Sequence, residues 1–109
     1  MINQKRIFSG IQPSGALHIG NYIGAIQQFV ELQDAHEAFY CIVDEHAITV
    51  PQEPDELRSD TLAVALTYLA AGVDPQKSVI FVQSHVPALA ELAWILNTFT
   101  RMGEFERMT

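Results

Sequence analysis

The chain is short of cysteine, of basic residues and of long apolar runs. Its single cysteine, Cys41, excludes an internal disulfide framework and lies in an apolar run, away from any Cys/His spacing typical of metal ligands. No apolar run approaches the roughly 20 residues of a membrane-spanning helix, and residues 1–6 lack the apolar core of a signal peptide. We therefore expect a cytoplasmic protein with no membrane segment and no protein-bound metal site.

The scarcity of basic residues limits where nucleic acid could bind. The chain has six Lys and Arg residues and 13 Asp and Glu residues, which gives a formal net charge of −7. A surface that binds phosphate backbones needs clustered Lys and Arg, whereas here they are scattered from Lys5 to Arg107. Any main nucleic-acid surface is therefore expected outside this segment. The 109 residues, 49% of them hydrophobic, suffice for one small domain with a core.

Apolar patterns alternate along the chain between strand and helix periods. Continuous apolar runs predict strands at residues 6–10 (expected to be central), 39–43 and 79–82 (both expected to be buried). Helices are predicted at residues 19–33, where Gly24 suggests close packing on the sheet, at 55–71, ended by Gly72, and at 86–99, capped by His85. The alternation predicts an α/β fold with a parallel, Rossmann-like sheet. Three strands make only the first half of a doubly wound fold, so we expect a truncated domain.

A glycine-rich turn, Gly10-Ile11-Gln12-Pro13-Ser14-Gly15-Ala16-Leu17-His18-Ile19-Gly20-Asn21-Tyr22, joins the first strand to the first helix. Such a turn is where an α/β sheet offers a phosphate site. His18 and Asn21 are three residues apart and can both donate hydrogen bonds from one helical face. The Walker and dinucleotide patterns do not fit, because Gly15 precedes Ala16 and the glycine spacing differs.

Residues 13–21 resemble the HIGH signature of class I aminoacyl-tRNA synthetases, in a variant with Asn21 as the fourth residue, similar to the tryptophanyl branch. Further blocks similar to that branch lie at residues 8–15, 20–25, 41–49, 81–87 and 103–109, in the same order and over essentially the whole chain. The resemblance therefore assigns residues 1–109 to the N-terminal portion of the synthetase's Rossmann catalytic domain.

The resemblance implies activation of tryptophan by ATP, followed by transfer of the amino acid to tRNA-Trp. It implies catalytic roles for His18 and Asn21, an ATP site at Gln12, Pro13, Ser14, Gly20 and Asn21, and a tryptophan pocket bordered by Phe8, Gly10 and His46. Mg²⁺ would accompany ATP, and the protein would form a homodimer, with Trp94 in a helix whose apolar surface suits an interface. The KMSKS loop, the acidic residue for the indole N–H and the anticodon-reading helices would lie beyond Thr109, so the 109-residue chain alone is expected to be inactive.

Other interpretations of the same residues remain open. A binding-only adenylate module, or a nucleotidyltransferase-like module that does not charge tRNA, would use a similar turn. Asp44 and Glu45 resemble an acid/base pair, but adjacent residues at a strand end point apart, so we expect structural or solvated roles. His36 is expected to be a solvated loop residue and Cys41 a core residue.

Overall fold

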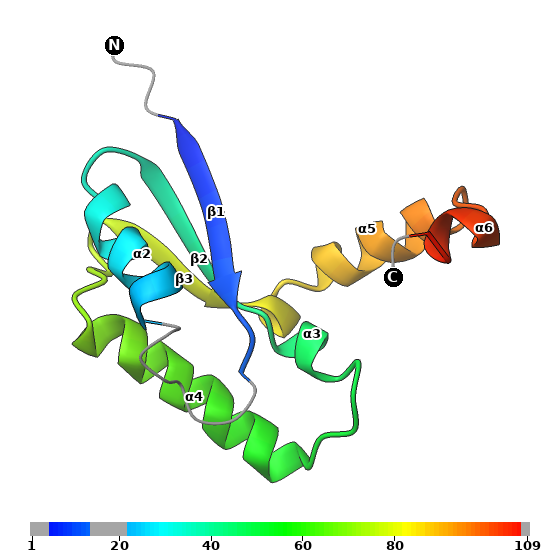
Figure 1. Ribbon diagram of the computed structural model, residues 1–109, viewed down its shortest axis with the longest axis horizontal. Helices are drawn as coiled ribbons and strands as arrows, with labels where there is room; N and C mark the ends of the chain where they lie inside the picture. Colours follow the sequence, from blue (N-terminus) through cyan, green and yellow to red (C-terminus); the bar gives the residue numbers. More distant parts are fainter. Residues whose placement is uncertain (1–4, 14–21, 108–109) are drawn as a thin grey trace.

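The computed structural model describes residues 5–13 and 22–107, which contain one sheet of three parallel strands (Figure 1). The strands are β1 (Arg6–Ile11), β2 (Glu37–Ile42) and β3 (Ser78–Val82), hydrogen-bonded in the order β1-β2-β3. β2 pairs in parallel with both neighbours, with Ile42 opposite Ile11 on one side and Val82 on the other. The predicted α/β fold with a parallel sheet is confirmed.

Helical segments connect the strands and follow the last one. They are η1 (Tyr22–Ile26, a π-helical turn) continuing into α2 (Gln27–Leu32), α3 (Asp44–Ala47), α4 (Pro54–Ala70), η2 (Gln83–His85, a 3₁₀ turn), α5 (Pro87–Asn97) and α6 (Met102–Phe105). Within the described residues, no helix has both the length and the apolarity needed to cross a bilayer.

Helix α4 has a start signal at its first turn and ends at the predicted stop signal, Gly72. Pro54 occupies the first turn, where backbone N–H groups have no partner within the helix, so the N–H that proline lacks is not needed. Asp55 and Glu56 place negative charge at the positive end of the helix dipole. Gly72 follows the helix with φ of +104°, a conformation that residues with a Cβ rarely adopt. The predicted helix at residues 55–71 is therefore confirmed to within one residue at each end.

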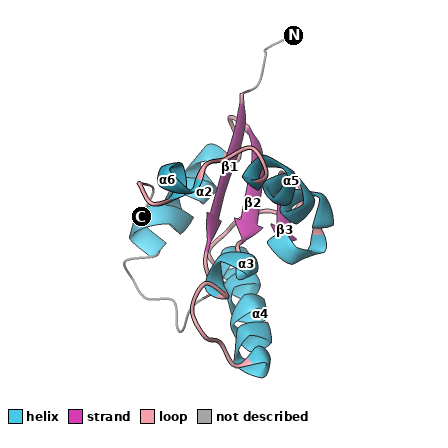
Figure 2. Cartoon of the chain, turned by 90° about the vertical axis from the view of Figure 1, so that its right-hand side faces the viewer, coloured by secondary structure: helices cyan, strands magenta, loops and turns pink. Residues whose placement is uncertain are grey.

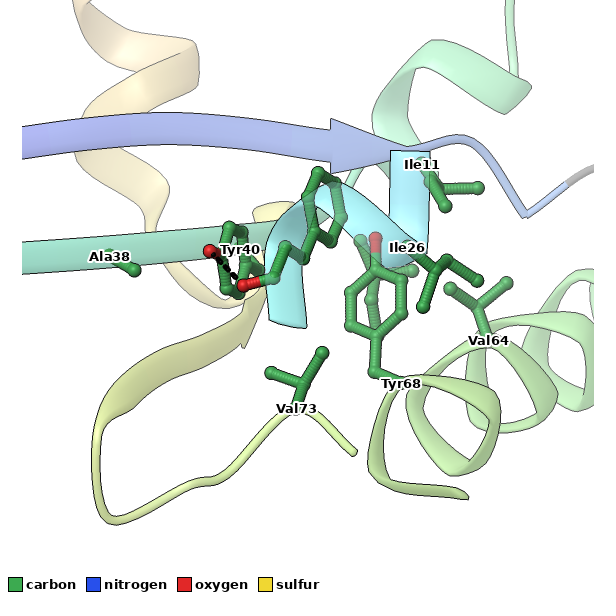
Figure 3. Packing of buried hydrophobic residues seen from close by; sticks show 9 residues of the cluster. Ile11, Ile26, Ala38, Tyr40, Val64, Tyr68 and Val73 are labelled. Atoms are coloured by element: carbon green, nitrogen blue, oxygen red, sulfur yellow. Dashed lines mark hydrogen bonds between the residues drawn. The ribbon is translucent and has the colours of Figure 1, made fainter. Parts of the chain in front are cut away.

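One face of the sheet carries the core, and both α2 and α4 pack on it (Figure 3). The ring of Phe29 in α2 stacks on Tyr40 in β2, with centroids 4.2 Å apart and an interplanar angle of 9°. The same ring meets Tyr68 of α4 edge-on at 5.6 Å. Offset and edge-on aromatic pairs of this kind add to the stabilisation that comes from burial. The core therefore fixes both helices against the central strand.

Part of the opposite face of the sheet and the whole of α5 stay open to solvent. Phe8 is 64% exposed and Val79 48% exposed, and no residue of α5 is buried. α5 and α6 extend away from the sheet, on the side opposite α2 and α4 (Figures 1 and 2). The predicted third helix forms, but the described chain provides nothing that covers its apolar side chains.

Three expectations about packing are wrong for the described residues. β1 is an edge strand rather than a central one, because β2 is its only neighbour. β3 is the other edge, and with Val79 half-exposed it is not fully buried. A Cβ built on Gly24 meets no atom within 4 Å, because this glycine lies on the exposed side of η1 and not against the sheet.

Candidate functional site

Polar side chains follow every strand at one edge of the sheet. Gln12 comes directly after β1, Asp44 and His46 lie in α3 after β2, and Gln83 and Ser84 lie in η2 after β3. The strands are parallel, so their carboxyl ends meet at this edge, where α/β sheets bind their ligands. Side chains from three separate parts of the sequence are thereby brought to one place.

The residues predicted to bind ATP are only partly among those described. Gln12 is exposed and Pro13 is buried at the carboxyl end of β1, so this end of the predicted site lies at the expected edge. The remaining residues predicted for ATP binding and catalysis lie outside the described residues: Ser14, His18, Gly20 and Asn21. Their roles stay predictions.

Gly10, predicted to border the amino-acid pocket, occupies a position where no larger residue fits. A Cβ built on Gly10 would lie 2.5 Å from the carbonyl oxygen of Cys41 and 3.2 Å from Cγ1 of Val43. The same carbonyl accepts a hydrogen bond from the hydroxyl of Tyr68 at 3.2 Å, so it is held from the core side. The close approach of β1 to β2 at the site edge therefore depends on this glycine.

The open face of the sheet brings two phenylalanines together next to this glycine. Phe8, also predicted to border the pocket, has its ring centroid 6.2 Å from that of Phe81, two strands away. Adjacent strands lie about 4.8 Å apart, so the two rings meet above β2, whose Phe39 and Cys41 pair in register with Phe8 and Phe81. An apolar surface suited to a flat ring results, and Phe81 is a member that the sequence did not single out.

His46, the third residue predicted for the pocket, is held by a residue from the neighbouring strand end. Its Nδ1 lies 3.1 Å from Oε1 of Gln83, and its backbone carbonyl accepts a hydrogen bond from the hydroxyl of Thr49 at 2.8 Å. The side chain remains exposed. His46 is thus oriented but accessible, as a ligand-contacting side chain must be.

Asp44 joins the same two segments through a second set of hydrogen bonds. Its Oδ1 accepts from the backbone N–H of Ser84 at 3.0 Å, and its Oδ2 accepts from the Ser84 hydroxyl. The structural role expected for Asp44 is confirmed. The capping role expected for His85 is wrong, because Val86 is the N-cap of α5 and no side chain caps this helix.

A cleft of about 500 Å³ lies beside this edge, between the first half of α4 and the segment after β3. Its lining combines apolar residues with charged and polar ones, and it includes Asp44, Leu57, Arg58, Ser84 and His85. It shares Asp44 and Ser84 with the hydrogen bonds described above. Of the residues predicted to bind ATP or tryptophan, those that the structure describes do not line it: Phe8, Gly10, Gln12, Pro13 and His46.

Cys41 is not a candidate nucleophile. Burial raises the pKa of its thiol to about 11, and the negative charges of Asp44 and Glu45 add to the effect. The thiol is therefore protonated at neutral pH and unreactive, in agreement with its predicted place in the core. Across residues 5–13 and 22–107, no three His, Cys, Asp or Glu side chains gather in a group that could hold a metal ion.

Sequence reasoning missed Gln83, Ser84 and Phe81 as site residues, although a usable signal was present. The polar pair follows an apolar run of strand length, just as Asp44 and His46 follow the preceding run. Because parallel strands end at a common edge, the two polar groups could have been predicted to meet. The particular pairs depend on the strand register, which the pattern of residues does not reveal.

A parallel sheet that gathers polar side chains at its carboxyl edge is the architecture of nucleotide-binding α/β domains. The family described as tRNA synthetases class I (W and Y) matches residues 3–109. The chain belongs to this family.

Curated relatives within the family are close in sequence. The tryptophan--tRNA ligase of Clostridium tetani is 62% identical over 107 residues, which cover 98% of this chain and 32% of the relative. The tryptophan--tRNA ligase of Enterococcus faecalis is 61% identical over 105 residues, which cover 96% of this chain and 31% of the relative. The chain thus spans about a third of the length of these relatives.

Solved structures agree with the fold. Tryptophanyl-tRNA synthetase from Campylobacter jejuni, in complex with ADP and tryptophan, superposes with a TM-score of 0.88 at 48% identity, covering 94% of this chain and 32% of that one. The enzyme from Mycoplasma pneumoniae superposes with a TM-score of 0.91 at 38% identity, and the match covers 97% of this chain and 32% of that one. The three-stranded sheet and its helices are therefore shared with members of the family.

Proposed function

We propose that this chain is the N-terminal portion of the Rossmann catalytic domain of a tryptophan--tRNA ligase. The observation that carries the proposal is the high identity to enzymes of that name over nearly the whole chain, including 62% for the Clostridium tetani relative. The carboxyl edge of the sheet supports it, since Phe8, Gly10 and His46 all lie on the strands or turns that form this edge.

The proposed reaction has two steps. A carboxylate oxygen of tryptophan attacks the α-phosphorus of ATP in line, and pyrophosphate leaves, which gives tryptophanyl-adenylate. A ribose hydroxyl of the terminal adenosine of tRNA-Trp then attacks the activated carbonyl, and AMP leaves. Such phosphoryl chemistry depends on positioning the reactants and on stabilising charge on the phosphate oxygens.

In the first step, the turn after β1 would hold ATP. Gln12, Pro13 and Ser14 would line the nucleotide, Gly20 and Asn21 would lie under the phosphates, and His18 would donate hydrogen bonds to them. Mg²⁺ is proposed to accompany the nucleotide through phosphate oxygens and water. No residue of this chain is proposed as its ligand.

The indole ring of tryptophan would lie against the open face of the sheet. Phe8 and Phe81 provide an apolar surface, with ring centroids 6.2 Å apart. Gly10 allows the close approach of β1 to β2 beside these rings, and His46 provides the polar border. The Campylobacter jejuni enzyme was solved with ADP and tryptophan, and we propose the same pair of ligand classes for this protein.

The other proposed partners are tRNA-Trp and a second copy of the protein. With a formal net charge of −7 over 109 residues, the chain is proposed to leave most of the tRNA contact to other regions. The exposed apolar side chains of α5, among them Trp94, support a homodimer interface. The proposed compartment is the cytoplasm, where charged tRNA is used.

Amino-acid-dependent exchange of pyrophosphate into ATP, followed by charging of tRNA-Trp, tests the proposal on the full-length enzyme. We expect tryptophan to support both reactions and tyrosine, the other substrate named in the family description, to support neither. Exchange or adenylate binding without charging would favour the adenylate-binding paralogue. ATP turnover that does not depend on an amino acid would favour a nucleotidyltransferase. The 109-residue chain alone serves as a control and should not charge tRNA.

A further inference from the structure

The contact between His46 and Gln83 favours one tautomer of the histidine ring. The amide oxygen of Gln83 can only accept a hydrogen bond, and it lies 3.1 Å from Nδ1 of His46. With the Gln83 amide in this orientation, Nδ1 is the donor and carries the proton. In the neutral ring Nε2 is then left as an acceptor, and no hydrogen bond within the described part of the chain engages it.

A second contact holds this pair at its spacing. Asp44, two residues before His46, binds both the backbone N–H and the hydroxyl of Ser84, the residue after Gln83. Hydrogen bonds to a carboxylate are shorter and stronger than those between neutral groups. The turn after β2 and the turn after β3 are thus fastened to each other, so Gln83 reaches His46 from a fixed position.

The pair also lies next to the aromatic surface. Gln83 is two residues after Phe81, whose ring meets Phe8, and His46 follows the strand between them. A ligand ring on Phe8 and Phe81 would therefore have its polar groups close to the turns that hold His46 and Gln83. An acceptor there suits an N–H donor of an amino acid.

We propose that Gln83 is a positioning residue of the amino-acid pocket. It fixes the Nδ1–H tautomer of His46, so that Nε2 accepts a hydrogen bond from the α-ammonium group of bound tryptophan, while Asp44 and Ser84 hold the two turns together. The inference rests on the proposed function, since it concerns the substrate pocket of that enzyme.

The test compares two substitutions of one residue in the full-length enzyme. Gln83→Met keeps the length of the side chain and removes the acceptor, whereas Gln83→Glu keeps an acceptor. In tryptophan-dependent pyrophosphate exchange, Gln83→Met should raise the KM for tryptophan by about tenfold, the size expected for one lost hydrogen bond. The KM for ATP should stay within about twofold, because removing one substrate's contact leaves the other unchanged. Gln83→Glu should recover most of the loss.

Nitrogen-15 NMR of histidine-labelled enzyme measures which ring nitrogen of His46 is protonated. A purely structural role of Gln83 would leave this tautomer unchanged. The wild-type His46 ring should show a protonated Nδ1 and an unprotonated Nε2, and Gln83→Met should shift the population towards the other tautomer. Gln76→Met, the same change at an exposed glutamine before β3, should alter neither readout. Its melting temperature also controls for general destabilisation.

The possible results distinguish a failure of the role proposed for Gln83 from a failure of the proposed function. An active wild type in which Gln83→Met leaves the tautomer and the KM for tryptophan unchanged overturns the inference alone. The same holds if the KM values for both substrates rise equally. A wild type without tryptophan-dependent exchange overturns the proposed function, and with it the role of Gln83 in that pocket.

Discussion

The hydroxyl of Tyr40 donates a 2.8 Å hydrogen bond to the backbone carbonyl of Phe29, and the rings of the same two residues stack on each other (Figure 3). Strand β2 and helix α2 are thereby joined by two contacts between the same two residues. Burial raises the pKa of Tyr40, so the hydroxyl keeps its proton and remains a donor.

Tyr40→Phe keeps the ring stack and removes only the hydroxyl. The carbonyl of Phe29 also accepts from the backbone N–H of Gln33 at 3.2 Å, so it is not left without a partner. We therefore expect a loss of about 1 kcal/mol in the free energy of unfolding, measured by urea denaturation. Tyr40→Ala should cost about 3–5 kcal/mol through the cavity it leaves. Equal losses of unfolding free energy in the two variants would contradict this prediction, because they would mean that the ring of Tyr40 adds nothing beyond its hydroxyl.

Two glycines should respond in opposite ways to the same substitution. Gly10→Ala forces a Cβ to within 2.5 Å of the Cys41 carbonyl, so β1 and β2 must separate. We expect a loss of about 1–3 kcal/mol of stability and weaker tryptophan binding. Gly24→Ala meets no atom within 4 Å in a helical segment, where alanine is favoured by up to about 1 kcal/mol. Thermal unfolding of both variants provides the comparison, and a stabilised Gly10→Ala would contradict the geometry.

Cys41 should make stability depend on alkaline pH. Its pKa is about 11 in the folded chain against an ordinary value of 9.0, so folding favours the protonated thiol. This contribution to stability is fully present below pH 9, and it is lost as the pH rises through about 11.

The same shift should protect the thiol from alkylation. The difference of two pKa units lowers the thiolate fraction at pH 8 about 100-fold, and burial slows the reaction further. Iodoacetamide should therefore modify Cys41 at least about 100-fold more slowly in the native protein than in urea, as measured by mass spectrometry of its peptide. Rapid labelling of native protein at pH 8 would show that the thiol is accessible.

Much of the fold could be predicted because strands and helices carry local signals. The strand predicted at residues 79–82 differs from β3 by one residue, and Pro54 and Gly72 mark the limits of α4. Exposure could not be predicted in this way. The apolar run of β3 indicated burial, yet Val79 is 48% exposed, because burial depends on what covers a strand and not on the strand itself.

The candidate site could be predicted only in part. Phe8, Gly10 and His46 are predicted through resemblance, and the structure adds a physical reason for a glycine at position 10. The contacts of Asp44 with Ser84 and of His46 with Gln83 join residues 40 and 37 positions apart. Such pairs follow from the register of β2 with β3, which periodicity does not determine.

His18→Ala tests the proposed catalytic role of the glycine-rich turn in the full-length enzyme. His18 is proposed to donate to phosphate oxygens whose charge rearranges only during the reaction, so its loss should affect the transition state more than the ground state. The activation barrier should rise by roughly 2–4 kcal/mol, seen as a lower turnover number in pyrophosphate exchange. An unchanged turnover number with a raised KM for tryptophan would refute the role.

Helix α5 provides the test of the proposed homodimer. None of its 11 residues is buried, and Trp94 is 72% exposed at its centre. Isolated helices shorter than about 12–15 residues are marginal in water, so α5 needs apolar contacts with another surface. Trp94→Glu places a charge where a dimer would bury an aromatic ring, a kind of residue that often dominates interface energies. We expect the full-length variant to dissociate to monomers at concentrations where the wild type is dimeric, as measured by sedimentation velocity, whereas Glu91→Gln on the same helix should remain dimeric. A Trp94→Glu dimer as stable as the wild type would place the interface elsewhere, and the apolar surface of α5 would then have to be covered within one subunit.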